Sequence, residues 1–224
     1  MKKHVIIVAG GSGTRMNNKI PKQFLLIAGK PMLFYTIDTF YNFSKDLNII
    51  LVLPSSQIER WKKLCKKFNY KVPHSIVKGG RTRFNSVKNG LKFINEAGII
   101  AVHDGVRPMV SNKTISNVYN AAEKHGVAIP VIAVNDSLRE LSDKTNWSVN
   151  RNKYKIVQTP QCFRSDILLK AYEQKYNETF TDDASVVEKS GVKIFLVEGN
   201  KENIKITTTL DLSIAESLIN HIPE

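Results

Sequence analysis

The residues from Val5 to Phe24 constrain the fold of this chain more than any other stretch. They open with VIIV, a run of β-branched residues that is too short for a helix and is typical of a strand buried on both faces of a sheet. Three glycines and two cations follow this run: Gly10, Gly11, Gly13, Arg15 and Lys22. Because glycines leave backbone N–H groups uncovered, such a loop can surround an anion closely. We therefore predict a phosphate site at the carboxyl edge of a parallel sheet.

Two known phosphate-binding motifs do not match this loop. A P-loop requires G-x-x-x-x-G-K-[ST], whereas these glycines lie closer together and no Lys-Ser or Lys-Thr pair follows them. A dinucleotide fingerprint requires a third glycine or an alanine where this chain has Met16. The glycines alone could form a simple turn, but cations beside a buried strand end are costly unless an anion binds there. A phosphate site of another kind is the better interpretation.

Apolar runs and helix signals alternate along the rest of the chain. Expected strands cover residues 48–53, 75–77, 99–102, 127–131 and 193–197. Expected helices cover residues 31–40, 55–68 (capped by Ser55 or Ser56), 82–94, 111–125, 165–176, 182–190 and 210–219. This alternation predicts a Rossmann-like α/β fold, a three-layer sandwich with a mostly parallel sheet. The length of 224 residues, with 42% hydrophobic residues, fits one domain with an ample core.

The alternation breaks between residues 135 and 158. This segment is polar, with turn residues in its middle and β-like ends, so we predict a β-hairpin that projects from the body. A projecting hairpin is either a flexible excursion or a dimerisation arm. Its unpaired edges favour the arm, and hence a homodimer.

The net charge of +13 leaves three kinds of explanation open: a nucleic-acid partner, a polyanionic substrate or a generally basic proteome. Four lysines, at 62, 63, 66 and 67, share one face of an expected helix with no aromatic interleaving, which indicates a solvated face. We expect no nucleic-acid partner. Cys65 and Cys162 lack a CxxC spacing, so neither a disulfide nor zinc is indicated. With no signal-peptide pattern and no apolar run near the roughly 18 residues that span a bilayer, we expect a cytoplasmic protein.

Two motifs place polar groups where expected strands end. GGRTR at 79–83 opens a helix with Ser86 one turn on, where backbone and hydroxyl groups can read a flat base edge. A capped glycine turn is the simpler alternative. HDGVRP at 103–108 follows a buried strand directly, so Asp104 and Arg107 reach the same edge of the sheet. A salt-bridged turn between these two is the alternative there.

Three later motifs add groups suited to phosphates. Ser137 and Arg151 flank the expected arm, and a hydroxyl with a guanidinium commonly holds a phosphate monoester. TDDAS at 181–185 is a helix-capping pattern. NIKIT at 203–207 places Lys205 in an expected apolar strand, where burial without an anion would be costly.

These motifs carry a family resemblance over residues 5–212. AGGSGTRM followed by PKQF resembles the opening signature of the sugar-phosphate nucleotidyltransferases, in particular the cytidylyltransferases acting on 2-C-methyl-D-erythritol 4-phosphate and on ribitol 5-phosphate. The arm D-S-x(13)-R and the TDDASVVE helix are more similar to the methylerythritol-phosphate enzymes of isoprenoid biosynthesis. A ribitol-5-phosphate enzyme is the alternative, and a nucleotide-binding module without catalysis is a third reading.

The resemblance implies a homodimeric, CTP-dependent enzyme that uses a polyol phosphate and Mg²⁺ held mainly by the CTP phosphates, with no metal ligand from the chain. Its implied catalytic residues are Arg15, Lys22 and Lys205. Its implied CTP-binding residues are Ala9, Gly10, Gly11, Gly13, Gly80, Arg81, Ser86 and Gly105. Its implied polyol-phosphate-binding residues are Asp104, Arg107, Ser137, Arg151 and Thr181. The residues themselves, several cations without a nucleophile–base pair, suit nucleotidyl transfer, in which positioning and charge neutralisation do most of the catalysis.

Overall fold

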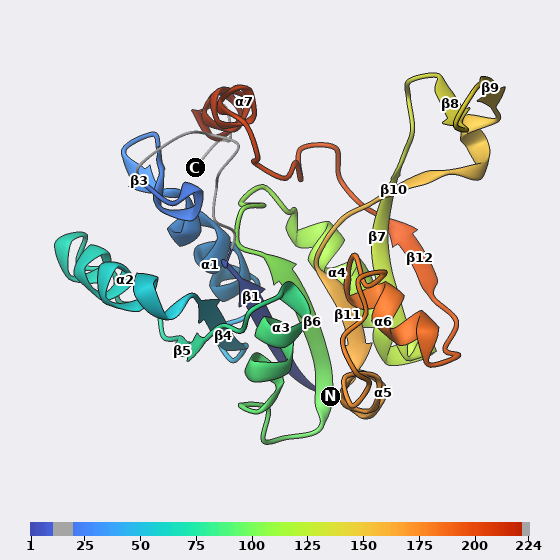
Figure 1. The fold of residues 1–224 in the computed structure, drawn as a ribbon. Helices are drawn as coiled ribbons and strands as arrows, with labels where there is room; N and C mark the ends of the chain where they lie inside the picture. Colours follow the sequence, from blue (N-terminus) through green and yellow to red (C-terminus); the bar gives the residue numbers. More distant parts are fainter. Residues whose placement is uncertain (11–19, 221–224) are drawn as a thin grey trace.

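A central sheet organises the structure, a computed structural model that describes residues 1–10 and 20–220 (Figure 1). Within these residues the sheet has eight strands in the order β10-β7-β11-β6-β1-β4-β5, with β12 also paired to β7. The strands are β1 (Lys2–Val8), β4 (Asn48–Leu53), β5 (Ser75–Lys78), β6 (Gly98–Asp104), β7 (Val127–Ala133), β10 (Lys155–Val157), β11 (Gln161–Arg164) and β12 (Phe195–Glu198).

The sheet is mostly parallel, as the sequence predicts. β5, β4, β1 and β6 are parallel neighbours, and so are β7 and β12. β11 lies antiparallel between β6 and β7, and β10 continues antiparallel along β7. Sequence patterns did not predict β11, because QCFR at 161–164 is a short run with no apolar alternation. This strand places Gln161 beside the end of β6, where the polar motifs gather.

The described residues contain seven helices, and most begin near the expected positions; the first six flank the sheet, whereas the last packs beside the hairpin at residues 26–31. They are α1 (Met32–Phe43), α2 (Ser55–Lys67), α3 (Arg83–Leu91), α4 (Asn112–His125), α5 (Ser165–Ala171), α6 (Asp183–Lys189) and α7 (Thr209–Asn220). The expected serine cap of α2 is wrong: Pro54 occupies the N-cap and no side chain caps the helix. The expected helices 82–94 and 165–176 end early, at Leu91 and Ala171. None of the helices in this described part is both long and apolar enough to cross a membrane.

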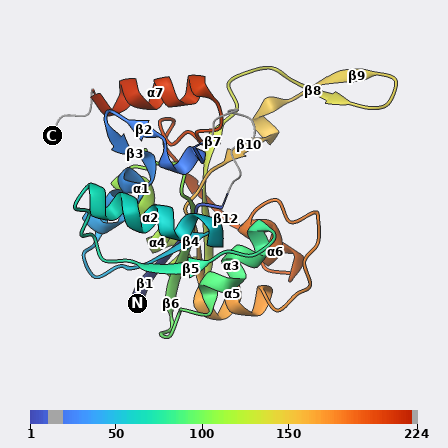
Figure 2. The ribbon, with the colours of Figure 1, turned by 60° about the vertical axis from the view of Figure 1, so that its left-hand side comes forward.

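Two hydrophobic layers cover the two faces of the sheet. Along β1, Val5 and Ile7 pack in a core with residues of α1, α2 and α4, whereas Ile6 packs in a second core with residues of α3, α5 and α6. This strict alternation follows from the period of two in a strand. Figure 2 shows the helices on both sides of the strands. The three-layer α/β sandwich expected from the sequence is therefore confirmed.

A hairpin projects from this body in both views (Figures 1 and 2). It consists of the antiparallel strands β8 (Leu138–Leu141) and β9 (Asn146–Val149). The expected arm over 135–158 is too long at its end, because β10 pairs with β7 in the main sheet. A one-turn 3₁₀ helix, η3 (Arg151–Lys153), joins the hairpin to β10. A smaller hairpin that the sequence analysis missed, β2 (Leu26–Ile27) with β3 (Lys30–Pro31), follows a second 3₁₀ turn, η2 (Lys22–Phe24).

Candidate active site

A cleft of about 280 Å³ opens where β1 and β4 end. Residues assigned to nucleotide binding from the resemblance line it: Ala9, Gly10, Gly80, Arg81 and Ser86. The expected catalytic residues Lys22 and Lys205 line the same cleft, together with Asp104. Gly11, Gly13 and Arg15 lie outside the described residues. Two lysines that are far apart in the sequence thus reach one rim of the sheet.

Gly105 lies beside this cleft without lining it. Its N–H donates to the carbonyl of Val8, 2.9 Å away, which joins the ends of β6 and β1. A Cβ atom at this position would stand 2.9 Å from the Cβ of Ala9 and 3.1 Å from Leu33 Cδ1. Glycine is therefore required for close packing under the cleft.

The glycine segment before α3 is braced by Ser86. The Oγ atom of Ser86 accepts from the N–H of Gly80 at 3.1 Å and donates to the carbonyl of Thr82 at 2.9 Å. Thr82 caps α3, because its Oγ1 accepts from the N–H of Asn85 at 3.1 Å. The Ser86 hydroxyl proton is therefore engaged, which leaves the oxygen as an acceptor only for a further partner. The capped turn, which was the simpler alternative, is therefore present through Thr82, and the expected site residue Ser86 braces it.

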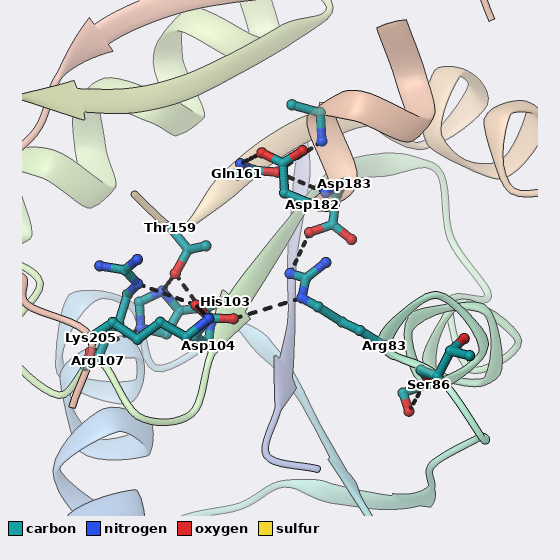
Figure 3. Close-up of polar contacts among 12 residues, drawn as sticks. Arg83, Ser86, His103, Asp104, Arg107, Thr159, Gln161, Asp182, Asp183 and Lys205 are labelled. Carbon is teal, nitrogen blue, oxygen red and sulfur yellow. Dashed lines mark hydrogen bonds and ion pairs between the residues drawn. The ribbon is translucent and has the colours of Figure 1, made fainter. Parts of the chain in front are cut away.

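Asp104 at the end of β6 is surrounded by three cations (Figure 3). Its carboxylate lies 3.1 Å from Nζ of Lys205, 3.2 Å from Nε of Arg107 and 3.7 Å from Nε of Arg83. Burial alone would raise the pKa of Asp104, but these three charges outweigh burial and hold that pKa well below its ordinary range. Asp104 is thus an anion throughout the physiological range, and the salt bridge to Arg107 that was the alternative interpretation of this motif is present.

Lys205 reaches Asp104 from an irregular segment. The expected strand at 203–207 is wrong, since these residues form no strand and the side chain of Lys205 is 45% exposed. The neighbouring Ile206 is buried, and its N–H donates to the carbonyl of Val106 at 2.9 Å. That contact pins the segment beside the end of β6. The placement of Lys205 in the cleft does not need a strand.

Arg83 is a residue that the sequence analysis did not select. Its Nη2 donates to Oδ2 of Asp183 at 2.6 Å, and its Nε faces Asp104. GGRTRFNS at 79–86 resembles a family segment with the spacing G-G-x-x-R-x-x-S, in which the arginine is Arg83, whereas Arg81 was assigned to CTP binding. Arg81 is exposed on the rim of the cleft. The spacing of that pattern is the signal that could have identified Arg83.

A second cleft, of about 270 Å³, adjoins the first. Three of the residues expected to bind the polyol phosphate line it: Asp104, Arg107 and Thr181. Arg83, Asp104 and Lys205 line both clefts. The buried Gln161 forms part of the wall, and its amide holds the first turn of α6 by accepting from Asp183 N and Ala184 N at 3.1 and 2.9 Å. Gln161 and Thr159 belong to QTPQ at 158–161, which resembles a T-P-Q element of the family that is expected to be structural around the site.

Ser137 and Arg151 line neither cleft within one chain. Both are exposed. The guanidinium of Arg151 donates to the carbonyl of Asn135 across the base of the hairpin. A single chain therefore does not bring the two expected phosphate ligands of the arm to Asp104.

His103 is fully buried behind Asp104. Its Nε2 lies 3.0 Å from the carbonyl of Arg107, which only accepts, so Nε2 carries the proton. Its Nδ1 then accepts from the hydroxyl of Thr159 at 3.0 Å, and Thr159 Oγ1 accepts from the N–H of Asp104 at 3.1 Å. Burial lowers the pKa of His103 to about 4. This neutral imidazole fixes the backbone of the site.

The two clefts adjoin at the carboxyl ends of the strands, and lysines line the first of them. This arrangement is typical of an α/β nucleotidyltransferase, in which cations neutralise the phosphates of a nucleotide. The particular family is given by comparison. The chain belongs to the 2-C-methyl-D-erythritol 4-phosphate cytidylyltransferase (IspD) family, whose model matches residues 3–221.

Curated relatives and solved structures agree over nearly the whole chain. The 2-C-methyl-D-erythritol 4-phosphate cytidylyltransferase of Phocaeicola vulgatus is 53% identical over 219 residues, covering 98% of this chain and all of that protein. That of Clostridium acetobutylicum is 42% identical and covers 96% of both. The crystal structure of 4-diphosphocytidyl-2C-methyl-D-erythritol synthase from Anaerococcus prevotii has a TM-score of 0.83 at 28% identity, covering 98% of this chain and 99% of that one. The Thermus thermophilus cytidylyltransferase has a TM-score of 0.80 at 29% identity, with 98% and 100% covered.

Proposed function

We propose that this protein transfers a cytidylyl group from CTP to 2-C-methyl-D-erythritol 4-phosphate, giving 4-diphosphocytidyl-2-C-methyl-D-erythritol and pyrophosphate in isoprenoid precursor synthesis. The observation that carries the proposal is that Asp104 and Lys205 line both of two adjoining clefts. Two bound substrates would meet at these side chains. The names of the curated relatives identify the substrates.

The reaction needs charge neutralisation more than a strong base. An oxygen of the polyol phosphate, already anionic at neutral pH, attacks the α-phosphorus of CTP. A P–O bond forms there while the bond from the α-phosphorus to the β-phosphate oxygen breaks, and the electron pair leaves with pyrophosphate. Lys22 and Lys205 neutralise the phosphate oxygens, whose charge is greatest in the transition state. By family resemblance, Arg15 also neutralises charge on the phosphate oxygens. The resemblance assigns the N–H groups of Gly11 and Gly13 to binding of the triphosphate.

Lys205 is the cation that can change partners. Its side chain is 45% exposed, whereas those of Arg83 and Arg107 are 29% and 12% exposed. Arg107 has a second bond, from Nη1 to the carbonyl of Asn203 at 2.8 Å, and Arg83 has its bond to Asp183. When phosphates enter, Lys205 turns to them, and the two arginines keep Asp104 paired.

Magnesium enters the proposal as part of the nucleotide substrate. Among residues 1–10 and 20–220 there is no cluster of three His, Cys, Asp or Glu side chains that could hold a metal. The cleft carboxylate, Asp104, is engaged with three cations. We propose that Mg²⁺ would be held mainly by the CTP phosphates, where it would neutralise charge on the triphosphate.

The hairpin is proposed as a dimerisation arm. Large apolar side chains on it and beside it are exposed, namely Leu141 (77%), Trp147 (44%), Tyr154 (44%) and Ile156 (48%). Such a surface on a projecting hairpin suits burial against a second copy. In a dimer, Ser137 and Arg151 of one chain would bind the substrate phosphate in the second cleft of the other.

The compartment is proposed from the cysteines. Cys65 and Cys162 are free thiols, and Cys162 is buried beside the sheet core. Free thiols suit a reducing compartment, so we assign the protein to the cytoplasm. We also propose that the chain forms a single domain.

A substrate panel tests the proposal. The purified protein is incubated with Mg²⁺ and either CTP or UTP, and with either 2-C-methyl-D-erythritol 4-phosphate or ribitol 5-phosphate, while pyrophosphate release is recorded. We expect the CTP and methylerythritol pair to have the highest kcat/KM. Preference for ribitol 5-phosphate would replace the proposed substrate. CTP binding without pyrophosphate release in any combination would leave a non-catalytic binding module.

A further inference from the structure

Arg83 joins two buried carboxylates that belong to different walls of the site. It is the first residue of α3, and Figure 3 shows its side chain extended between Asp104 and Asp183. Asp183 is fully buried and is the first residue of α6. Besides Arg83, it accepts from the hydroxyl of Tyr172 at 2.6 Å. Both carboxylates have other partners, but Arg83 contacts the two together.

The segments before these two helices line different clefts. Residues 79–82 precede α3 and line the nucleotide cleft, whereas Thr181 and Asp182 precede α6 and line the second cleft. The start of α6 is itself fixed, because Gln161 Nε2 donates to Asp182 at 2.7 Å and a capping box joins Asp182 to Ser185. Arg83 is therefore the link between a preformed α6 start and Asp104.

We infer that Arg83 is a positioning residue for the polyol phosphate: through Asp104 and Asp183 it sets the relative placement of the two sides of the second cleft. The inference rests on the proposed function. Arg83 acts on Asp104 on one side and on the segment carrying Thr181 on the other. Its loss should therefore weaken binding of the polyol phosphate more than binding of CTP, whose cradle is braced independently by Ser86 and Thr82.

The planar fork of arginine is essential to this role. A guanidinium presents several N–H donors in fixed directions, so it can face two carboxylates at once, whereas a lysine ammonium is a single point charge on a flexible stem. Arg83→Lys keeps the charge but loses the fork. We expect the melting temperature of Arg83→Lys to stay closer to wild type than its affinity for the polyol phosphate does.

Simple removal of Arg83 is a poor test, because it leaves Asp183 as a buried carboxylate without its cation, and such a variant can be unstable. The double variant Arg83→Gln/Asp183→Asn removes both charges together and leaves two amides that can hydrogen-bond to each other. The double variant leaves no unpaired charge at position 183, but it removes the cation that Arg83 presents to Asp104. Stability and positioning are thereby separated.

The experiment compares wild type, Arg83→Lys, the double variant and a control. The control is Arg164→Gln/Asp166→Asn, an exposed arginine–aspartate pair 2.6 Å apart that lines neither cleft. For each protein we measure the melting temperature, the Kd of CTP and the Kd of 2-C-methyl-D-erythritol 4-phosphate by calorimetry, and the kcat and KM for pyrophosphate release.

The inference predicts that the double variant melts close to wild type, binds CTP within about threefold of wild type and binds the polyol phosphate at least about tenfold more weakly. The control should match wild type in every measurement. Wild-type polyol-phosphate affinity in the double variant would overturn the inference and leave Arg83 as a structural residue only, and so would an equal loss of affinity for both substrates. Absence of pyrophosphate release by wild type would instead refute the proposed function, while the two binding constants would still decide the role of Arg83.

Discussion

The Nζ atom of Lys205 lies 3.1 Å from Oδ2 of Asp104, in the cleft that Lys22 also lines. This contact joins a segment near the end of the chain to the end of β6. Because Asp104 has two arginine partners as well, loss of Lys205 does not leave a buried charge unpaired. The site can therefore lose this lysine without losing its local structure, which makes its contribution to the reaction measurable.

Lys205→Gln should lower kcat by about 100-fold or more while the melting temperature stays close to wild type, because a cation that stabilises transition-state charge is lost and the Asp104 ion pairs remain. Steady-state kinetics and thermal unfolding measure the two effects. A fall in melting temperature with little change in kcat would assign Lys205 a structural role instead.

Lys22→Ala should lower kcat far more than it raises the KM for CTP. The reason is that negative charge on the phosphate oxygens of the reacting centre increases as pyrophosphate leaves, so the lysine interaction is stronger in the transition state than in the ground state. Initial rates over a range of CTP concentrations give both constants. An unchanged kcat would refute the transition-state role.

Predictions from the sequence were most accurate for elements whose structure depends mainly on their own residues. Asn48–Leu53 was predicted with the bounds observed, because NIILVL before a proline has few alternatives. Ser111 and Thr82 cap their helices as their positions indicate. Lys22, Lys205 and Asp104 were selected from motifs, and the structure brings them into one cleft.

The features that could not be predicted from the sequence depend on contacts between distant segments of the chain. Arg83 owes its place to Asp183, 100 residues along the chain, and no local pattern records that partner. β11 exists because β6 and β7 each offer it an edge, since its own four residues do not favour a strand. Lys205 was assigned to a strand from its apolar neighbours, but Ile206 is buried through a loop contact.

A mixed dimer tests whether the hairpin completes the partner's site. Chains carrying Lys22→Ala and chains carrying Arg151→Gln are co-expressed with different tags, and the dimer that holds one of each is purified. If Arg151 acts across the interface, one of the two sites has both residues intact, and about half of wild-type activity should be measured at polyol-phosphate concentrations well below the wild-type KM. Activity as low as in the two parent dimers would place Arg151 in its own chain's site.

Arg139→Gln is the matched control for the arm. Arg139 is an exposed arginine of the same hairpin, bonded to Asn146 rather than to Asn135. We expect its KM for the polyol phosphate to equal that of wild type, whereas Arg151→Gln should raise this KM by about tenfold or more through loss of a charge-assisted contact. Equal effects of both substitutions would mean that general charge on the hairpin, rather than a specific contact, is what matters.

The stability of the fold should fall as the pH decreases from about 6.5 toward 4. Burial lowers the pKa of His103 to about 4 from 6.5, so between these values the unfolded chain binds a proton that the folded chain does not. This residue alone should reduce the free energy of unfolding by about 2 kcal/mol between pH 7 and pH 5. Burial also lowers the pKa values of His4 and His74, which adds to the same slope.

Urea unfolding at several pH values measures this slope, and NMR titration of the imidazole carbon signals assigns it to His103. A His103 signal that titrates near pH 6.5 in the folded protein, with stability independent of pH over this range, would contradict the buried neutral imidazole that supports Asp104.

The most direct test of the account follows the α-phosphate of CTP. The protein is mixed with Mg²⁺, 2-C-methyl-D-erythritol 4-phosphate and CTP labelled in its α-phosphate, and the products are separated. We predict that all of the transferred label appears in 4-diphosphocytidyl-2-C-methyl-D-erythritol, with one unlabelled pyrophosphate released per labelled product. Label that remains in CTP despite nucleotide binding, or that appears in free CMP without a polyol product, would contradict nucleotidyl transfer at this site.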